Sequence, residues 1–154
     1  MLGEDDYNDV RAMSNALRNH IQYNELADVV EVLPSVRRVM KARLFIDSDV
    51  AVLPTYYVNE GQPLAVIEAM ARGLPVIATK WRSLDEIMVD GVNGLVVPPR
   101  SPLSIARAAA RFVDPTFYEG VSRNAVETAR NFSVAAHVDR MAEVFTSVNH
   151  PPGR

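Results

Sequence analysis

The sequence contains no cysteine among its 154 residues, and it contains no long hydrophobic run. Without cysteine, the chain can form no disulfide, no thiolate metal site and no cysteine nucleophile. No stretch approaches the roughly 20 apolar residues of a membrane-spanning helix, so we expect no membrane span. Residues 1–6 lack the basic head and apolar run of a secretory signal, and the sequence therefore predicts a cytoplasmic protein, either free or at the inner face of a membrane.

Charge of one sign is not in excess either. The chain carries 16 basic and 19 acidic residues, for a net charge of −3, and 14 of the 16 basic residues are arginines spread along the sequence. A nucleic-acid-binding protein normally shows a basic surplus or a clustered basic stripe. We therefore predict no nucleic-acid partner, and we expect any anion site to be local, built from a helix N-terminus and one or two arginines.

The composition is that of an ordinary globular domain. Hydrophobic residues make up 48% of the chain and charged residues 23%, close to average usage. A chain of this length is also the size of one domain. We therefore predict one domain over residues 1–148 and a short tail over residues 149–154, in which Pro151 and Pro152 stop the last helix.

Short apolar runs alternate with helical patterns along the chain. The runs predict strands at residues 29–33, 49–54, 75–79 and 95–97. Apolar spacing and start signals predict helices over residues 7–23, 36–46 and 63–72, and others that begin near residues 83, 101, 114 and 133. Pro63 and Gly73 bracket the third helix, and Ser83 with Glu86 has the spacing of a capping box. This alternation predicts an α/β fold, a Rossmann-like open parallel sheet with helices on both faces.

In such a sheet a ligand binds at the carboxyl ends of the strands, which places the site in the loop after residue 54. Gly61 lets the backbone approach a ligand, and the amides of the helix turn that follows suit a phosphate. Glu60 and Glu68 bring carboxylates, which accept hydrogen bonds from neighbouring hydroxyls, so one is suited to a sugar and the other to a ribose. Spacing alone leaves a plainer alternative for Glu68, a surface ion pair with Arg72 four residues later.

Several segments together form one pattern: residues 49–54, Glu60-Gly61 with Pro63-Leu64, Glu68-Ala69-Met70, residues 73–79, Glu86-Ile87, and residues 90–95 with Pro98. This pattern resembles the donor-binding C-terminal lobe of the group 1 (family 4) glycosyltransferases, which are two-lobed enzymes of the GT-B fold. The resemblance implies transfer of a sugar, with retained anomeric configuration, from a UDP- or GDP-sugar to a glycan or lipid acceptor, as in polysaccharide biosynthesis. It implies no metal and no cofactor.

The resemblance also assigns residues to each part of the nucleotide sugar. The donor sugar is assigned to Glu60, Gly61 and Gln62, the diphosphate to Pro63 and Leu64, the ribose to Glu68, and the base to Pro34, Ser35 and Val36. No catalytic residue is assigned in this chain. Its three histidines, at positions 20, 137 and 150, lie outside the motif and are predicted to be helix-surface or tail residues.

One loop departs from the family pattern. Many relatives carry paired glycines shortly before the position of Glu86, whereas this chain has Lys80-Trp81-Arg82-Ser83. One interpretation is a cleft wall that selects donor or acceptor, in which Trp81 stacks on a sugar and Lys80 or Arg82 reaches a phosphate. The alternative is a loop packed by Trp81, with both cations in solvent.

The front of the lobe departs further. In the family, two strands precede the first strand found here, an Arg and Lys pair neutralises the diphosphate, and an N-terminal lobe holds the acceptor site; the sequence shows none of these. With the strand order 3-2-1-4-5-6, losing two strands leaves a gap of roughly 10 Å between residues 29–33 and 49–54. We therefore expect a rearranged sheet, a second chain that completes it by self-association, or a lobe that keeps its shape only approximately.

These expectations describe an N-terminally truncated lobe that transfers little or no sugar by itself. A second hypothesis is a non-catalytic nucleotide-sugar-binding module, or a split subunit activated by a partner. A third is a different nucleotide-sugar enzyme of similar fold, such as an epimerase. Retention of both Glu60 and Glu68 favours a chain that still binds a nucleotide sugar.

Overall fold

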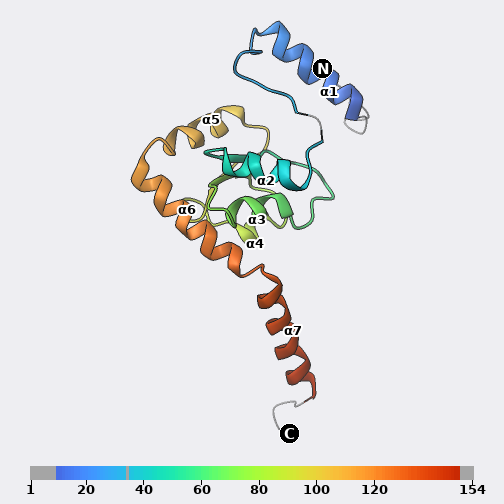
Figure 1. Ribbon diagram of the computed structural model, residues 1–154, viewed down its shortest axis with the longest axis vertical. Helices are drawn as coiled ribbons and strands as arrows, with labels where there is room; N and C mark the ends of the chain where they lie inside the picture. Colours follow the sequence, from blue (N-terminus) through green and yellow to red (C-terminus); the bar gives the residue numbers. More distant parts are fainter. Residues whose placement is uncertain (1–9, 34, 150–154) are drawn as a thin grey trace. The chain divides into compact units, whose positions relative to one another are not determined.

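The computed structural model describes residues 10–33 and 35–149 (Figure 1). The chain divides into two compact units, Met1–Met40 and Lys41–Arg154. One helix, α2 (Arg38–Ile46), begins in the first unit and continues into the second. The domain expected over residues 1–148 stays a prediction, and most of the expected tail lies outside the described residues.

The first unit contains α1 (Val10–Tyr23), which confirms the predicted helix over its described part. Its buried residue is Ile21, which is 8% exposed. The chain then turns, and the amide of Leu26 donates to the carbonyl of Ile21 at 2.9 Å. A cavity of about 410 Å³ lies between this helix and the turn, and its lining includes Ile21, Gln22, Ala27, Val30 and Val32.

The strand predicted over residues 29–33 is wrong. The amides of Val29 and Val30 donate back to the carbonyl of Leu26, at 3.1 and 2.9 Å, and no residue of this run pairs with a strand. Val29 is 78% exposed. A β-branched run becomes a strand only where a neighbouring strand takes up its amides and carbonyls. The expected order places this run beside strands that precede it, and residues 10–28 form a helix and a turn instead.

The second unit is built on a parallel sheet of three strands in the order β1-β2-β3. These are β1 (Ala51–Leu53), β2 (Val76–Thr79) and β3 (Leu95–Val97), which confirms the three other predicted strands. β2 pairs with β1 on one side and with β3 on the other, and all four of its residues are buried. Within the described chain, β1 pairs only with β2, so self-association at its outer edge stays a prediction.

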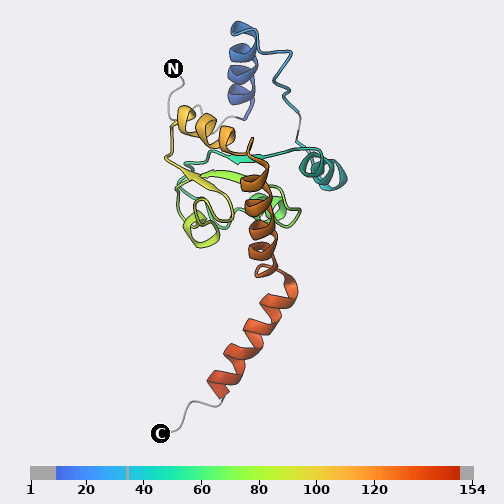
Figure 2. The ribbon, with the colours of Figure 1, turned by 90° about the vertical axis from the view of Figure 1, so that its left-hand side faces the viewer.

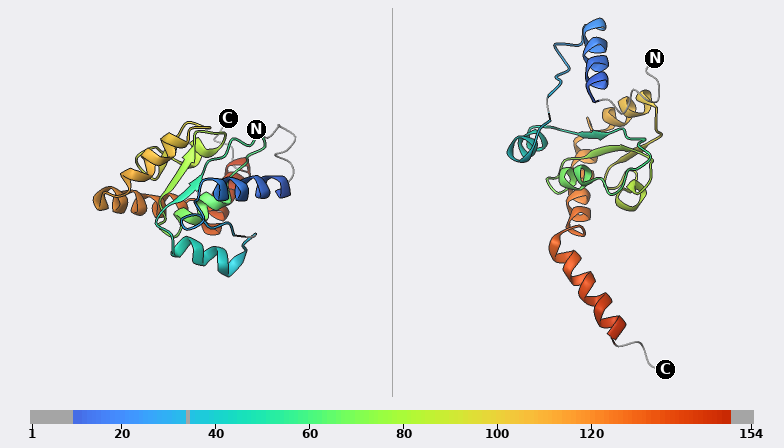
Figure 3. Two further views of the ribbon diagram at one scale, coloured as in Figure 1. Left: turned by 90° about the horizontal axis from the view of Figure 1, so that it is seen from above. Right: turned by 90° about the vertical axis from the view of Figure 1, so that its right-hand side faces the viewer.

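Helices cover both faces of this sheet (Figure 2 and Figure 3). Val76 and Ala78 face a core that includes α3 (Leu64–Met70) and α4 (Leu84–Ile87). Ile77 faces the opposite way, toward α5 (Pro102–Arg111), as the alternation of side chains along a strand requires. α6 (Pro115–Arg130) contributes to both cores, and α7 (Val134–Asn149) follows it. The expected α/β fold, an open parallel sheet with helices on both faces, is confirmed.

Aromatic rings close the second core at the junction of α5 and α6. The ring of Phe112 lies 5.5 Å from that of Phe117 and 6.2 Å from that of Tyr118, the second in an edge arrangement. Burial, and then the negative charge of Asp49, raises the pKa of Tyr118 above its ordinary value. Asp114 begins α6 as predicted, because its side chain accepts from the amides of Thr116 and Phe117.

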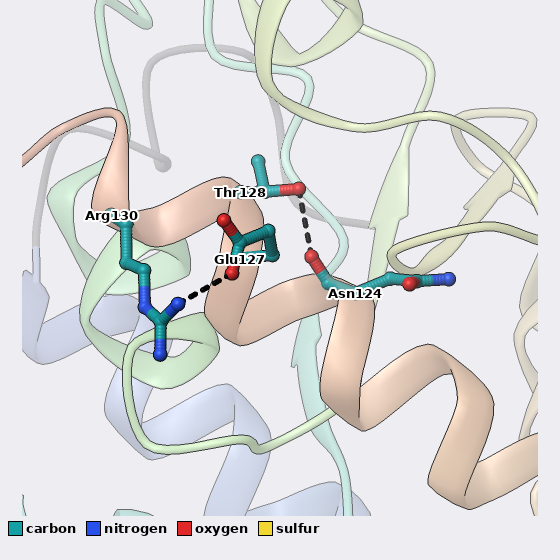
Figure 4. Close-up of polar contacts among 4 residues, drawn as sticks. All are labelled: Asn124, Glu127, Thr128 and Arg130. Carbon is teal, nitrogen blue, oxygen red and sulfur yellow. Dashed lines mark hydrogen bonds and ion pairs between the residues drawn. The ribbon is translucent and has the colours of Figure 1, made fainter.

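The turn before β3 is held by packing as well as by turn geometry. The buried side chain of Asn93 accepts from the amide of Val89 at 2.7 Å and donates to the carbonyl of Ile87 and the hydroxyl of Thr128, at 3.0 and 2.9 Å. The Thr128 hydroxyl donates in turn to the carbonyl of Asn124 (Figure 4). At Gly94, a Cβ atom would overlap the methyl group of Met88 and lie 2.8 Å from the carbonyl oxygen of Val76.

The packing at Gly94 predicts that Gly94→Ala lowers the free energy of unfolding by roughly 1–3 kcal/mol, because the backbone of β2 cannot yield to an added methyl. Urea denaturation measures this change. Gly120→Ala is the matched control, since a Cβ atom there meets nothing within 4 Å, and we expect it to be neutral or to stabilise α6 by up to about 1 kcal/mol. Equal stability of the two variants would contradict this packing.

Candidate functional site

Two loops meet at the carboxyl ends of β1 and β2. The first runs from residue 54 to residue 63, and the second runs from residue 80 to residue 83. Thr79, the buried last residue of β2, donates its hydroxyl to the carbonyl of Thr55 in the first loop. The central strand therefore anchors the loop that carries the first glutamate of the predicted motif.

Glu60 is half-buried, and its carboxylate has a fixed partner. The hydroxyl of Thr55 donates to Oε2 of Glu60 at 2.7 Å, and the amide of Tyr57 donates to the same hydroxyl at 3.2 Å. The amide of Glu60 donates to the carbonyl of Tyr57 at 3.1 Å. One carboxylate oxygen is thus held within the loop, and the other can accept a hydrogen bond from a ligand hydroxyl.

The second loop contributes two further side-chain donors. The indole Nε1 of Trp81 donates to the carbonyl of Tyr57 at 2.7 Å, and the hydroxyl of Ser83 donates to the carbonyl of Gly61. The capping box predicted for Ser83 and Glu86 is therefore wrong, although the short helix α4 that it marks is present. Ser83 occupies the N-cap position, but its hydroxyl donates to the carbonyl of Gly61 and accepts no hydrogen bond from a helix amide.

A cavity of about 410 Å³ lies beside this loop, lined by Val58, Lys80, Trp81, Arg82 and Asp85. Trp81 is half-buried and packs against the core below it, while Lys80 and Arg82 are exposed. The guanidinium carbon of Arg82 lies 6.0 Å from the centre of the Trp81 ring. The structure thus brings the three predicted wall residues to one cavity, and it also shows the packing of Trp81 that the alternative expected.

Glu68 lies on α3 and has a different partner from the one that spacing predicted. Its Oε2 lies 2.6 Å from Nζ of Lys41 on α2, with the two side chains 42% and 33% exposed. Arg72 donates to the backbone carbonyl of Glu68, so the predicted Glu68–Arg72 ion pair is wrong. An ion pair this exposed contributes less than about 1 kcal/mol, so a ligand can displace Lys41 at small cost.

Gly61 and Gln62 are exposed ahead of the first turn of α3. Pro63, which is buried, occupies the N-cap position, and the helix begins at Leu64, which is 63% exposed. A groove of about 410 Å³ lies on this side of α3, lined by Gln62, Leu64, Ile67 and, from the end of α6 onward, Phe132, Ser133, Val134, His137 and Arg140. The sequence did not predict His137 and Arg140 as neighbours of the motif, because tertiary packing brings them to this groove and no local pattern marks them.

The residues predicted to lie near the base are not placed with this site. Pro34 lies outside the described residues, and Ser35 and Val36 belong to the first unit. Glu60 and Glu68 belong to the second unit. His20 lies on α1 in the first unit, and His150 lies outside the described residues.

The described residues contain neither a cluster of metal ligands nor a membrane-spanning helix. No three His, Asp or Glu side chains of residues 10–33 and 35–149 gather as they would around a metal ion. No helix in the described part of the chain is both long enough and apolar enough to cross a membrane.

Comparison with known proteins identifies relatives of this chain. The family model for "Glycosyl transferases group 1" matches residues 2–115. A D-inositol 3-phosphate glycosyltransferase of Streptomyces griseus is 35% identical over 123 residues, which cover 79% of this chain and 26% of the relative. A putative colanic acid biosynthesis glycosyltransferase, WcaL of Salmonella typhimurium, is 29% identical over 140 residues, which cover 86% of this chain and 34% of the relative. The chain thus spans about a quarter to a third of these two relatives.

Solved structures have the same fold. Anabaena Alr3699/HepE in complex with UDP superposes with a TM-score of 0.78 at 25% identity, covering 96% of this chain and 38% of that one. Sucrose-phosphate synthase from Thermosynechococcus elongatus superposes with a TM-score of 0.76 at 27% identity, covering 92% of this chain and 35% of that one. The chain therefore belongs to the group 1 glycosyl transferases, as its motifs predicted, and has the α/β fold of a GT-B lobe.

Proposed function

We propose that this chain is the donor-binding part of a retaining glycosyltransferase, which transfers a sugar from a nucleotide sugar to a glycan or lipid acceptor. The observation that carries the proposal is the placement of Glu60, whose carboxylate is held by Thr55 at the carboxyl edge of the sheet. Ligands of open α/β sheets bind at this edge. The likeness to HepE in complex with UDP-glucose, with a TM-score of 0.74 at 26% identity, supports a nucleotide sugar as the ligand.

The proposed contacts follow the order of the donor's parts. Glu60, Gly61 and Gln62 bind the sugar, Pro63 and Leu64 lie at the diphosphate, and Glu68 binds the ribose after Lys41 is displaced. Pro34, Ser35 and Val36 lie near the base. Lys80, Trp81 and Arg82 form a wall of the cleft. No cofactor is needed, because the bond energy for transfer lies in the nucleotide sugar itself.

In this proposal the acceptor binds to residues outside the segment that matches the relatives. The relatives are three to four times as long as the matched segment, so an N-terminal lobe supplies the acceptor site and closes over the donor. The chain alone then binds donor and transfers little or no sugar. The likeness to the Salmonella relative, a putative colanic acid biosynthesis glycosyltransferase, supports a polysaccharide product. We place the protein in the cytoplasm, free or at the inner face of a membrane.

Donor binding predicts that the isolated chain binds UDP, UDP-glucose or GDP at millimolar or lower concentration, and ADP more weakly. Glu68→Gln weakens all four ligands by roughly 10-fold, because the ribose loses a charged acceptor. Amide chemical shifts in a ligand titration measure both effects.

Glu127→Gln is the matched control for this titration. Glu127 is also an exposed glutamate in an ion pair, with Arg130 at 2.7 Å on α6 (Figure 4), so its variant loses a comparable surface pair away from the site. If wild type binds none of these nucleotides, donor binding by this chain is refuted. If both variants bind as wild type does, the ribose role of Glu68 is wrong.

If the donor sugar approaches the backbone at Gly61, a larger residue there should weaken sugar binding without changing the stability of the protein. A Cβ atom at Gly61 would meet no atom of the protein within 4 Å, so Gly61→Ala leaves the stability nearly unchanged. The added methyl group would meet a bound sugar, and we expect UDP-glucose affinity to fall by roughly 10-fold or more. Isothermal titration calorimetry measures the affinity, and Gly120→Ala serves as the control. Unchanged affinity of Gly61→Ala would show that the sugar does not approach this residue.

A further inference from the structure

The loop that carries Glu60 is held from outside by alternate residues of one segment. Thr79, Trp81 and Ser83 each direct a side-chain donor into it, while Lys80 and Arg82 between them are exposed. The chain bends at Lys80 and turns at Arg82, whose φ is 50°, so the three donors come from the end of β2 and from the turn that leads into α4. The loop after β1 is thus fixed at three points by the end of β2 and the turn that follows it.

The acceptors of these donors are main-chain carbonyls on both sides of the glutamate. They belong to Thr55, Tyr57 and Gly61. Thr55 then passes the constraint to the carboxylate itself, because its hydroxyl donates to Oε2 of Glu60. The path of the backbone and the orientation of the carboxylate are therefore set together.

The contacts of Trp81 fix the position of its ring. Its N–H is engaged with the carbonyl of Tyr57, its ring packs on the core, and the guanidinium of Arg82 lies 6.0 Å from the ring centre. An indole held in this way can influence ligand binding by fixing the loop to which it is hydrogen-bonded.

We propose that Trp81 and Ser83 are positioning residues, which hold the loop so that Glu60 binds the sugar portion of the donor. This inference rests on the proposed function, since it assigns the sugar to Glu60. In this role both side chains act on the ligand through the loop, although the ring of Trp81 also lies in the wall of the cleft. Their loss therefore weakens the binding of the sugar and leaves the binding of the nucleotide nearly unchanged.

The test compares the affinities of UDP and UDP-glucose, measured by calorimetry on the full chain. Ser83→Ala removes one anchor, and we expect UDP-glucose to bind roughly 5- to 10-fold more weakly while UDP binds within about twofold of wild type. Ser83→Thr keeps a hydroxyl and restores the affinity for UDP-glucose. A purely structural role would weaken both ligands alike.

Ser122→Ala is the matched control. Its hydroxyl also donates to a glycine carbonyl, that of Gly73, at 2.6 Å, and the residue is half-buried like Ser83. This variant loses the same kind of bond between α6 and the end of α3. We expect it to bind both ligands as wild type does.

Trp81→Phe separates positioning from stacking. Phenylalanine keeps an aromatic face for a sugar but has no N–H for the carbonyl of Tyr57. Positioning predicts a loss of UDP-glucose affinity similar to that of Ser83→Ala, whereas stacking predicts affinity close to wild type. Trp81 is the one tryptophan of the chain, so its indole N–H signal in a nitrogen-proton spectrum reports directly whether the bond persists in each Ser83 variant.

The outcomes are distinguishable. If wild type binds neither UDP nor UDP-glucose, the proposed function fails and this inference fails with it. If wild type binds UDP-glucose and both Ser83→Ala and Trp81→Phe bind it equally well, the positioning role is overturned and donor binding stands. Equal weakening of UDP and UDP-glucose in Ser83→Ala also overturns the role, because the loop would then not act on the sugar alone.

Discussion

The burial of β2 is the constraint on which the second unit depends. The strand pairs with β1 on one edge and with β3 on the other, and its side chains face a core on each side of the sheet. A strand in this position leaves no freedom for its carboxyl end, which delivers Thr79 to the carbonyl of Thr55. The end of the sheet therefore anchors the loop that carries Glu60 at one of its three points.

The two glutamates of the motif are held in contrasting ways. Glu60 is half-buried and has its partner within a hydrogen-bonded loop, so its orientation is set before any ligand arrives. Glu68 lies on a helix surface and pairs with Lys41, whose side chain is 33% exposed. A carboxylate with a fixed orientation suits a ligand group that must be positioned accurately. A carboxylate in a weak surface ion pair suits a ligand group that only needs to be held, because the ligand can replace the lysine. This contrast is consistent with the proposal of a sugar at Glu60 and a ribose at Glu68.

Local sequence patterns predicted the elements whose formation depends on a few neighbouring residues. The three strands of the sheet and the start of α6 at Asp114 follow from apolar runs and a cap, and both were predictable. The conformation of residues 29–33 was not predictable in this way, because a strand forms only beside a neighbouring strand, which the sequence of the run itself cannot supply. The same limit explains Ser83, whose hydroxyl found the carbonyl of Gly61, and Glu68, whose partner Lys41 comes from another helix. The motif predicted the family of the chain, and tertiary contacts decided what each of its residues touches.

Anchoring through carbonyls has a consequence for how this site changes in evolution. Every peptide unit has a carbonyl, so the supports at residues 55, 57 and 61 survive substitution of the side chains around them. Val58, Asn59 and Gln62 are exposed in the same loop and carry none of those supports. Selection can therefore alter these three side chains, and with them the sugar that the proposed donor site prefers, while the carboxylate of Glu60 keeps its place.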